Sequence, residues 1–83
     1  MTLYEFKLMD ETSQAAMVWY APHIAERHLG DFSILLFQID GFYVELYYNN
    51  RQNKIDRFRS FSNVDLLTPY LSQIDLNGLF NGK

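Results

Sequence analysis

Apolar and polar residues alternate through the middle of the chain in the way that β-strands require. Two runs rich in aromatic and β-branched residues, 32–39 and 42–48, are separated only by Asp40-Gly41. Asp-Gly between two such runs is a strong hairpin signal, because the tight turn needs left-handed backbone angles. A third run, 54–61, follows a polar loop. The pattern therefore predicts an antiparallel meander at the centre of the protein.

The first thirty residues predict three further elements. Strict alternation over 3–8 is typical of a strand. Asp10 is a good helix N-cap, and Ala, Val and Trp residues at three- and four-residue spacing predict a short helix over 11–20. Pro22 ends that helix, because the residue before a proline avoids helical angles. Alternation over 23–29 then predicts an edge strand.

After Ser62 the apolar spacing becomes helical. The apolar positions of this stretch are Leu66, Leu67, Tyr70, Leu71 and Ile74, and Asn63 or Asp65 could cap a helix. Pro69 fits a helix only in its first turn, so either the helix begins near Thr68 or a separate turn over 64–67 precedes it.

The predicted fold class is therefore α+β. An antiparallel sheet is made of an N-terminal strand plus a four-strand meander. A short helix follows the first strand, and a C-terminal helix packs on one face. Residues 1–76 form this single domain, and 77–83, with two Asn-Gly pairs, form a C-terminal tail. The sequence leaves open which edge of the meander pairs with the N-terminal strand.

Turn lengths fix the expected register of the meander. The predicted cross-strand pairs are Ile39–Phe42, Phe37–Val44, Leu35–Leu46, Gln38–Tyr43, Leu36–Glu45, Ile34–Tyr47, Tyr48–Lys54, Val44–Phe58, Glu45–Arg57 and Tyr43–Arg59. This register separates two faces of the sheet. The expected core face, on which the helices should lie, carries Leu35, Phe37, Ile39, Phe42, Val44, Leu46 and Phe58.

The opposite face mixes aliphatic, tyrosine and charged residues. Its members are Ile34, Leu36, Gln38, Tyr43, Glu45, Tyr47, Ile55, Arg57 and Arg59. Such a mixture is typical of protein interfaces, and an exposed apolar patch on a small monomer usually has a function. The alternative is that Tyr4, Trp19 or the chain ends cover this face. We predict the interface.

Composition narrows the class of protein. Of the 83 residues 48% are hydrophobic and 17% aromatic, which excludes a disordered chain. A net charge of −3 argues against a general polyanion binder, and the absence of cysteine excludes disulfide and thiolate sites. Acidic residues in the first twenty positions and the lack of a long apolar run predict no secretory signal and no membrane helix. We expect a cytoplasmic protein.

Candidate chemistry is sparse. His23, Glu26 and His28 form the pattern H-x-x-E-x-H, but the five-residue gap should place the histidines on opposite sides of a strand, so we expect no metal site. The serines lie in no nucleophile motif, and the isolated glycines form no phosphate-binding loop. We therefore expect neither an enzyme nor a cofactor.

Nucleic-acid binding has a limited case. Residues 41–47 share features with an RNA-recognition strand, and the basic residues Arg51, Lys54, Arg57 and Arg59 cluster nearby. The spacing is one residue short of that motif, however, and Asp40 stands where a basic residue belongs. We do not expect nucleic acid to be the partner.

Four segments carry a resemblance to a known group. Residues 40–45, 57–61, 67–71 and 73–76 together resemble a family of short, uncharacterised bacterial proteins. The resemblance implies a bacterial, cytoplasmic protein with a stand-alone fold. It implies no activity, cofactor or catalytic residue.

The sequence thus predicts a small non-catalytic interaction module that self-associates as a homodimer. The predicted interface residues are Ile34, Leu36, Tyr43, Glu45, Tyr47, Arg57 and Arg59. Tyr43 and Tyr47 would be its anchors, and an unidentified protein partner is the other possible occupant. The alternative is a protein that binds a small anionic ligand or nucleic acid with Arg57 and Arg59, framed by Tyr43.

Overall fold

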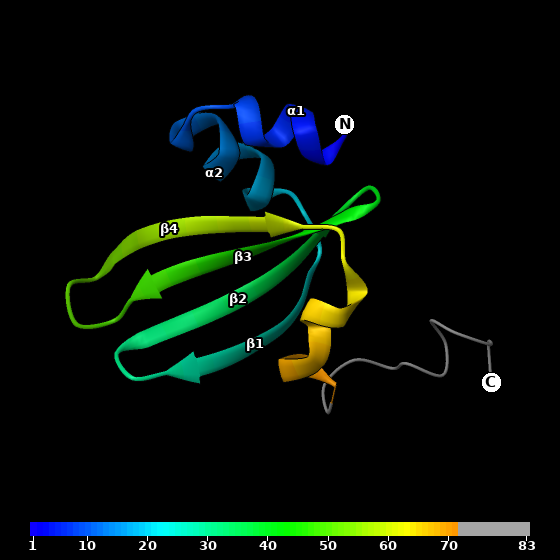
Figure 1. The fold of residues 1–83 in the computed structure, drawn as a ribbon. Helices are drawn as coiled ribbons and strands as arrows, with labels where there is room; N and C mark the ends of the chain where they lie inside the picture. Colours follow the sequence, from blue (N-terminus) through cyan, green and yellow to red (C-terminus); the bar gives the residue numbers. More distant parts are fainter. Residues whose placement is uncertain (72–83) are drawn as a thin grey trace.

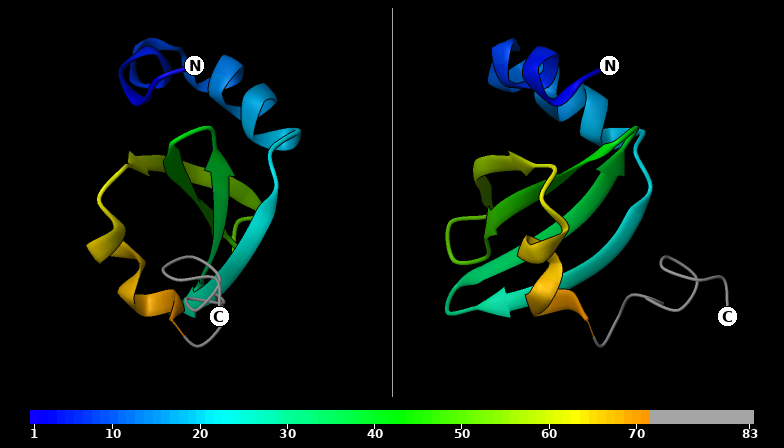
Figure 2. Two further views of the ribbon diagram at one scale, coloured as in Figure 1. Left: turned by 90° about the vertical axis from the view of Figure 1, so that its right-hand side faces the viewer. Right: turned by 45° about the vertical axis from the view of Figure 1, so that its right-hand side comes forward.

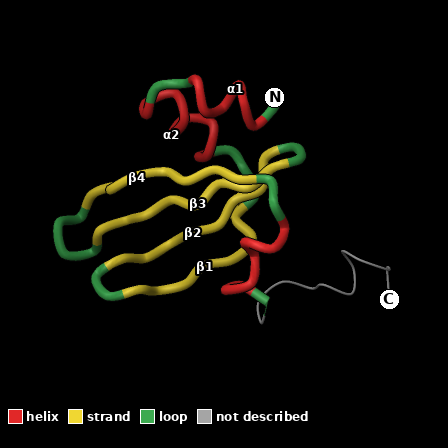
Figure 3. Tube along the Cα trace, in the orientation of Figure 1, coloured by secondary structure: helices red, strands yellow, loops and turns green. Residues whose placement is uncertain are grey.

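Within residues 1–71, the chain forms a four-stranded antiparallel sheet and three short helices (Figures 1 and 3). The computed structural model describes residues 1–71. Its elements are α1 (Leu3–Leu8), α2 (Glu11–Trp19), β1 (His23–Leu29), β2 (Phe32–Ile39), β3 (Phe42–Asn49), β4 (Lys54–Phe61) and the 3₁₀ helix η1 (Val64–Tyr70). The strands follow one another in the order β1-β2-β3-β4, which confirms the α+β class and the meander.

The central hairpin has the predicted register. Ile39 pairs with Phe42, and each pair from there to Ile34–Tyr47 is the expected one. Asp40 has a φ of 49°, in the left-handed region that aspartate tolerates, whereas Gly41 lies outside that region although the tight turn was expected to need it at both residues. Local turn chemistry therefore sets the pairing of β2 with β3.

The predicted register between β3 and β4 is wrong. Glu45 lies opposite Arg59 rather than Arg57, and Asn49 rather than Tyr48 pairs with Lys54. The side chain of Asn49 accepts hydrogen bonds from the backbone N–H groups of Arg51 and Gln52, and the loop is shortened to 50–53. A β-bulge near Tyr48 then shifts the register again.

The predicted N-terminal strand is also wrong, because residues 3–8 form the helix α1. Thr2 and Glu5 make a capping box: the Glu5 N–H donates to Thr2 Oγ1 at 3.1 Å, and the Thr2 N–H donates to Glu5 Oε1 at 2.7 Å. The N-terminal ammonium group also pairs with Asp40 at 2.8 Å. Capping thus prevails over an alternating pattern only six residues long.

The next two elements agree with the sequence prediction. Asp10 caps α2, accepting a hydrogen bond from the Ser13 N–H at 2.8 Å. Residues 23–29 form the edge strand β1, although a bulge interrupts its pairing between His23 and Ala25. The helix and strand signals were therefore sufficient here.

Two apolar clusters hold helices on opposite faces of the sheet (Figure 2). On one face, Phe6 of α1 and Val18 of α2 pack against the buried residues Ile39, Phe42 and Val44. On the other, η1 packs its buried residues against the sheet; the members of that cluster are Ala25, Leu36, Phe61, Leu67 and Tyr70. The prediction that all helices lie on one face is therefore wrong, because α1 and α2 lie on one face and η1 lies on the other.

The C-terminal element begins earlier than a helix starting at Thr68 would. Asn63 caps η1, accepting a hydrogen bond from the Asp65 N–H at 2.9 Å, and Pro69 lies inside the 3₁₀ turn. The helical position Ile74 and the tail 77–83 lie outside the described residues, as does the predicted domain boundary at 76.

Truncating Phe6 tests the importance of α1. Phe6 is fully buried and its ring lies 5.6 Å from that of Phe42. We expect Phe6→Ala to lower the free energy of unfolding by about 3 to 5 kcal/mol, measured by urea denaturation. Tyr4→Ala, on the exposed side of the same helix, should change it by less than about 0.5 kcal/mol. Equal effects would contradict the packing described here.

Candidate functional site

The face of the sheet that carries α1 and α2 is only partly covered by these helices. α1 and α2 pack over the hairpin end of β2 and β3, where Ile39, Phe42 and Val44 are buried. Farther along the same strands, Leu35 and Leu46 are only half-buried although they lie on the same face. The sheet therefore keeps an open apolar half.

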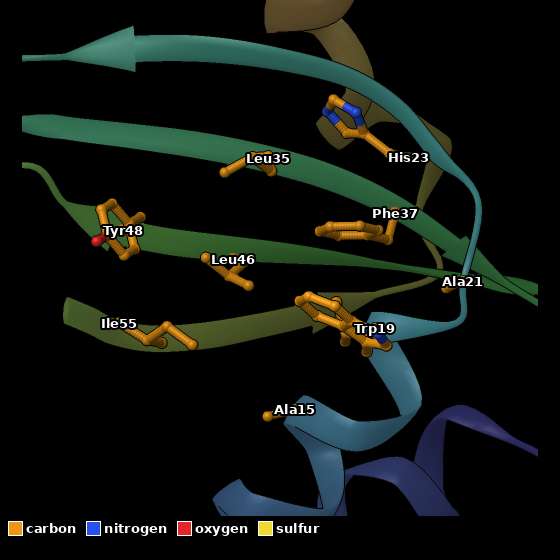
Figure 4. Close-up of a pocket in the computed structure, with 10 residues that line it drawn as sticks. Ala15, Trp19, Ala21, His23, Leu35, Phe37, Leu46, Tyr48 and Ile55 are labelled. Atoms are coloured by element: carbon orange, nitrogen blue, oxygen red, sulfur yellow. The ribbon is translucent and has the colours of Figure 1, made fainter. Parts of the chain in front are cut away.

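This open half is a groove of about 540 Å³, shown in Figure 4. Its lining residues are Ala15, Val18, Trp19, Ala21, His23, Leu35, Phe37, Leu46, Tyr48 and Ile55. They come from α2, the segment after it, and all four strands. None of the lining residues is Lys, Arg, Asp or Glu, so the groove is a mainly apolar surface without a carboxylate, ammonium or guanidinium group.

Trp19 stands at the rim of the groove. It is the last residue of α2 and is 81% exposed, although its indole lines the groove. Figure 4 shows Trp19 on the α2 side and His23 on the β1 side, with Phe37 between them and Leu35 and Leu46 farther along the strands on the floor. A large aromatic side chain left in water beside an apolar groove is the most unusual feature of this face.

The two histidines of β1 lie on the same side of the strand, contrary to expectation. The bulge between His23 and Ala25 turns His23 toward Glu26, whose carboxylate is 3.9 Å from His23 Nε2 and 3.5 Å from His28 Nε2. Strand alternation alone could not predict this, because it ignores bulges. Within residues 1–71, no group of three or more His, Cys, Asp or Glu side chains has an arrangement that could hold a metal ion.

On the opposite face, Glu45 is the centre of a buried polar cluster. Its side chain is 1% exposed, and its Oε2 accepts hydrogen bonds from the Tyr70 hydroxyl at 2.5 Å and from Arg27 at 3.4 Å. Its Oε1 accepts from Arg59 at 3.3 Å and from the Tyr47 hydroxyl at 3.4 Å. Four donors from β1, β3, β4 and η1 therefore satisfy one buried carboxylate.

Tyr70 connects this cluster to η1. Burial raises the pKa of its hydroxyl, and donation to Glu45 raises it further, while the nearby Arg27 partly opposes both effects. The neutral hydroxyl is thus strongly favoured in the folded protein. η1 is consequently held by a hydrogen bond as well as by the apolar contacts of Leu67.

The seven predicted interface residues share this face but differ in accessibility. Ile34, Leu36, Glu45 and Tyr47 are buried within the single chain, and η1 covers part of the face. Accessible surface is left by Tyr43, half-buried and stacked on Phe61 at 5.8 Å, and by Arg57 and Arg59.

Both arginines are engaged inside the chain. Arg57 pairs with Asp56 at 2.7 Å and lies over the ring of Tyr47 at 4.1 Å. Arg59 pairs with Glu45 and lies over the ring of Phe61 at 5.6 Å. The predicted Glu45–Arg57 pair is therefore replaced by Glu45–Arg59, as the corrected register requires.

The sequence pattern predicts Leu35, Phe37 and Leu46 of the groove on the core face. Its prediction of Ile55 on the opposite face is wrong, because Ile55 pairs with Tyr48 and lines the groove. The lengths of the elements distinguish groove residues from core residues. The helix α2 has nine residues and is about 13.5 Å long, whereas each eight-residue strand is about 27 Å long. A helix of that length cannot cover the apolar side chains of a whole strand.

In comparisons with known proteins, no family model, curated protein or solved structure matches this chain. Among the described residues, no helix is both long and apolar enough to cross a bilayer.

Replacing Tyr70 tests the buried cluster. Tyr70→Phe removes one donor from Glu45, and we expect it to lower the free energy of unfolding by about 1 to 3 kcal/mol at neutral pH. Because the folded pKa of Tyr70 is raised, its contribution is complete below the ordinary tyrosine pKa of about 10 and declines as the pH rises above it. The difference between wild type and variant, measured by urea denaturation, should shrink at alkaline pH. A difference independent of pH would contradict this role.

Proposed function

We propose that the chain is a small, non-catalytic interaction module that associates with a second copy of itself, and that the groove is the contact surface. The open apolar half of the sheet carries this proposal. Contiguous exposed apolar patches on soluble proteins often mark interaction sites. The proposal retains the homodimer and the cytoplasmic location expected from the sequence.

The energetics favour covering the groove. Burial of apolar surface contributes about 25 cal/mol per Å². Trp19 alone, at 81% exposure, offers an area on the order of 200 Å². A standard interface takes about 800 Å² from each partner, so the groove would form its apolar centre and the surrounding surface its polar rim.

The uncharged lining of the groove makes a highly charged partner a poor fit. Each chain carries a net charge of −3, so two copies repel one another at long range, and a contact through an uncharged surface adds no direct like-charge pairs to that repulsion. The lining contains no Asp, Glu, Lys or Arg. Contact through the groove therefore keeps the like charges of the two copies apart.

The other face supports partner binding less well. Of the predicted interface, Tyr43, Arg57 and Arg59 remain accessible, and these are the residues proposed for an anionic ligand. Both guanidinium groups already contact carboxylates, Arg57 at 2.7 Å and Arg59 at 3.3 Å. An anion would have to compete with these pairs, so we favour the groove.

A charge placed on the groove floor tests the proposal. We expect Leu35→Glu to weaken self-association at least about thirtyfold, because it buries an unpaired carboxylate at the centre of the contact. Analytical ultracentrifugation across a wide concentration range would measure the dissociation constant. Leu35 is half-buried and belongs to neither apolar cluster, so the fold should survive.

Leu29→Glu is the matched control. Leu29 is 58% exposed at the end of β1 and does not line the groove. The control should dimerise as the wild type does. Equal behaviour of the two variants, or a wild type that stays monomeric at every concentration, would contradict the proposed function.

A further inference from the structure

Trp19 and the groove lie on one patch of the surface, side by side. Most of the Trp19 indole is exposed to solvent within its own chain. The side chain therefore projects from the rim of the groove and does not fill the groove. A contact between two identical chains about a two-fold axis joins the same patch on each, so that a residue of one copy meets the groove of the other and the reverse. A projection next to a hollow is the arrangement that such a contact needs.

We propose that Trp19 of each copy inserts into the groove of the other, so that the groove is completed by a residue of the partner chain. This inference rests on the proposed function and adds the identity of the residue that fills the groove. The groove volume, about 540 Å³, lies in the range that admits ring-containing ligands, so it has room for an indole.

The lining suits an indole chemically. The ring of Phe37 lies 5.5 Å from that of His23, and both rings line the groove together with Tyr48. Aromatic rings pack favourably against one another in offset or edge-to-face arrangements. The floor residues Leu35 and Leu46 supply the aliphatic contacts.

Position on α2 also suits this role. Trp19 ends the helix, while Val18 beside it is buried in the cluster that fixes α2 to the sheet. The base of the Trp19 side chain is therefore held firmly, so little conformational freedom of the backbone is lost on binding. Rigid aromatic side chains of this kind are the residues on which binding energy concentrates at interfaces.

The fluorescence of Trp19 reports directly on this contact, because it is the only tryptophan in the chain. Its emission is measured across the concentration range in which ultracentrifugation detects the dimer, together with quenching by acrylamide. We expect the emission to shift to shorter wavelength, and quenching to weaken, in step with the dimer fraction.

One variant and a matched control test the contribution of the indole. Trp19→Ser should weaken self-association at least about thirtyfold. Tyr20→Ser should leave it unchanged, because Tyr20 is adjacent and 87% exposed but does not line the groove. Both positions are exposed, so both variants should keep the wild-type unfolding transition.

Mixing two defective variants tests reciprocity. Trp19→Ser removes one wall of the groove but keeps its floor of Leu35 and Leu46, and Leu35→Glu keeps the indole. Their mixed dimer restores one of the two insertions, so it should be tighter than the homodimer of either variant.

Failure of the inference differs from failure of the proposed function. A wild-type dimer in which Trp19 emission is unchanged, or in which Trp19→Ser associates normally, overturns the insertion of Trp19 and leaves the proposed function standing. A chain that remains monomeric at all concentrations overturns both.

Discussion

A mismatch in length between helices and strands shapes this protein. The helices α1 and α2 have six and nine residues, whereas β2, β3 and β4 each have eight. Because a residue adds about 1.5 Å to a helix and about 3.4 Å to a strand, the helices can bury only one end of the sheet. The groove is the remainder of that apolar face.

The opposite face is closed in a different way. η1 covers part of it, and the Tyr70 hydroxyl binds Glu45, the one buried carboxylate among the described residues. Arg27 and Arg59 supply the positive charge that makes this burial tolerable. The sheet therefore has one face whose centre is buried around Glu45, here called the Glu45 face, and another face whose apolar surface is partly open.

The sequence predicted those features that depend on local chemistry. The Asp40 turn fixed the hairpin register, and Asp10 marked the start of α2. Features that depend on β-bulges, which interrupt the alternation of a strand, were not predicted. The bulge near Tyr48 shifted β4, and the bulge after His23 brought two histidines to one side.

The assignment of faces could not follow from alternation alone. Alternation shows which residues share a face, but coverage depends on the length and position of the helices. Residues such as Leu35 and Leu46 were expected in the core and line the groove, whereas Ile34 and Leu36 were expected at an interface and are fully buried. The capping box of Thr2 and Glu5 was a readable signal for α1 that the short alternating run obscured.

The most direct test of the account is a map of the self-association surface by NMR. Chemical shifts of side-chain methyl and indole groups would be followed as the protein concentration rises. We expect the signals of Trp19, Leu35 and Leu46 to shift while those of Ile34 and Leu36, buried on the Glu45 face, do not. Shifts confined to the Glu45 face, or none at any concentration, would contradict the proposed contact through the groove.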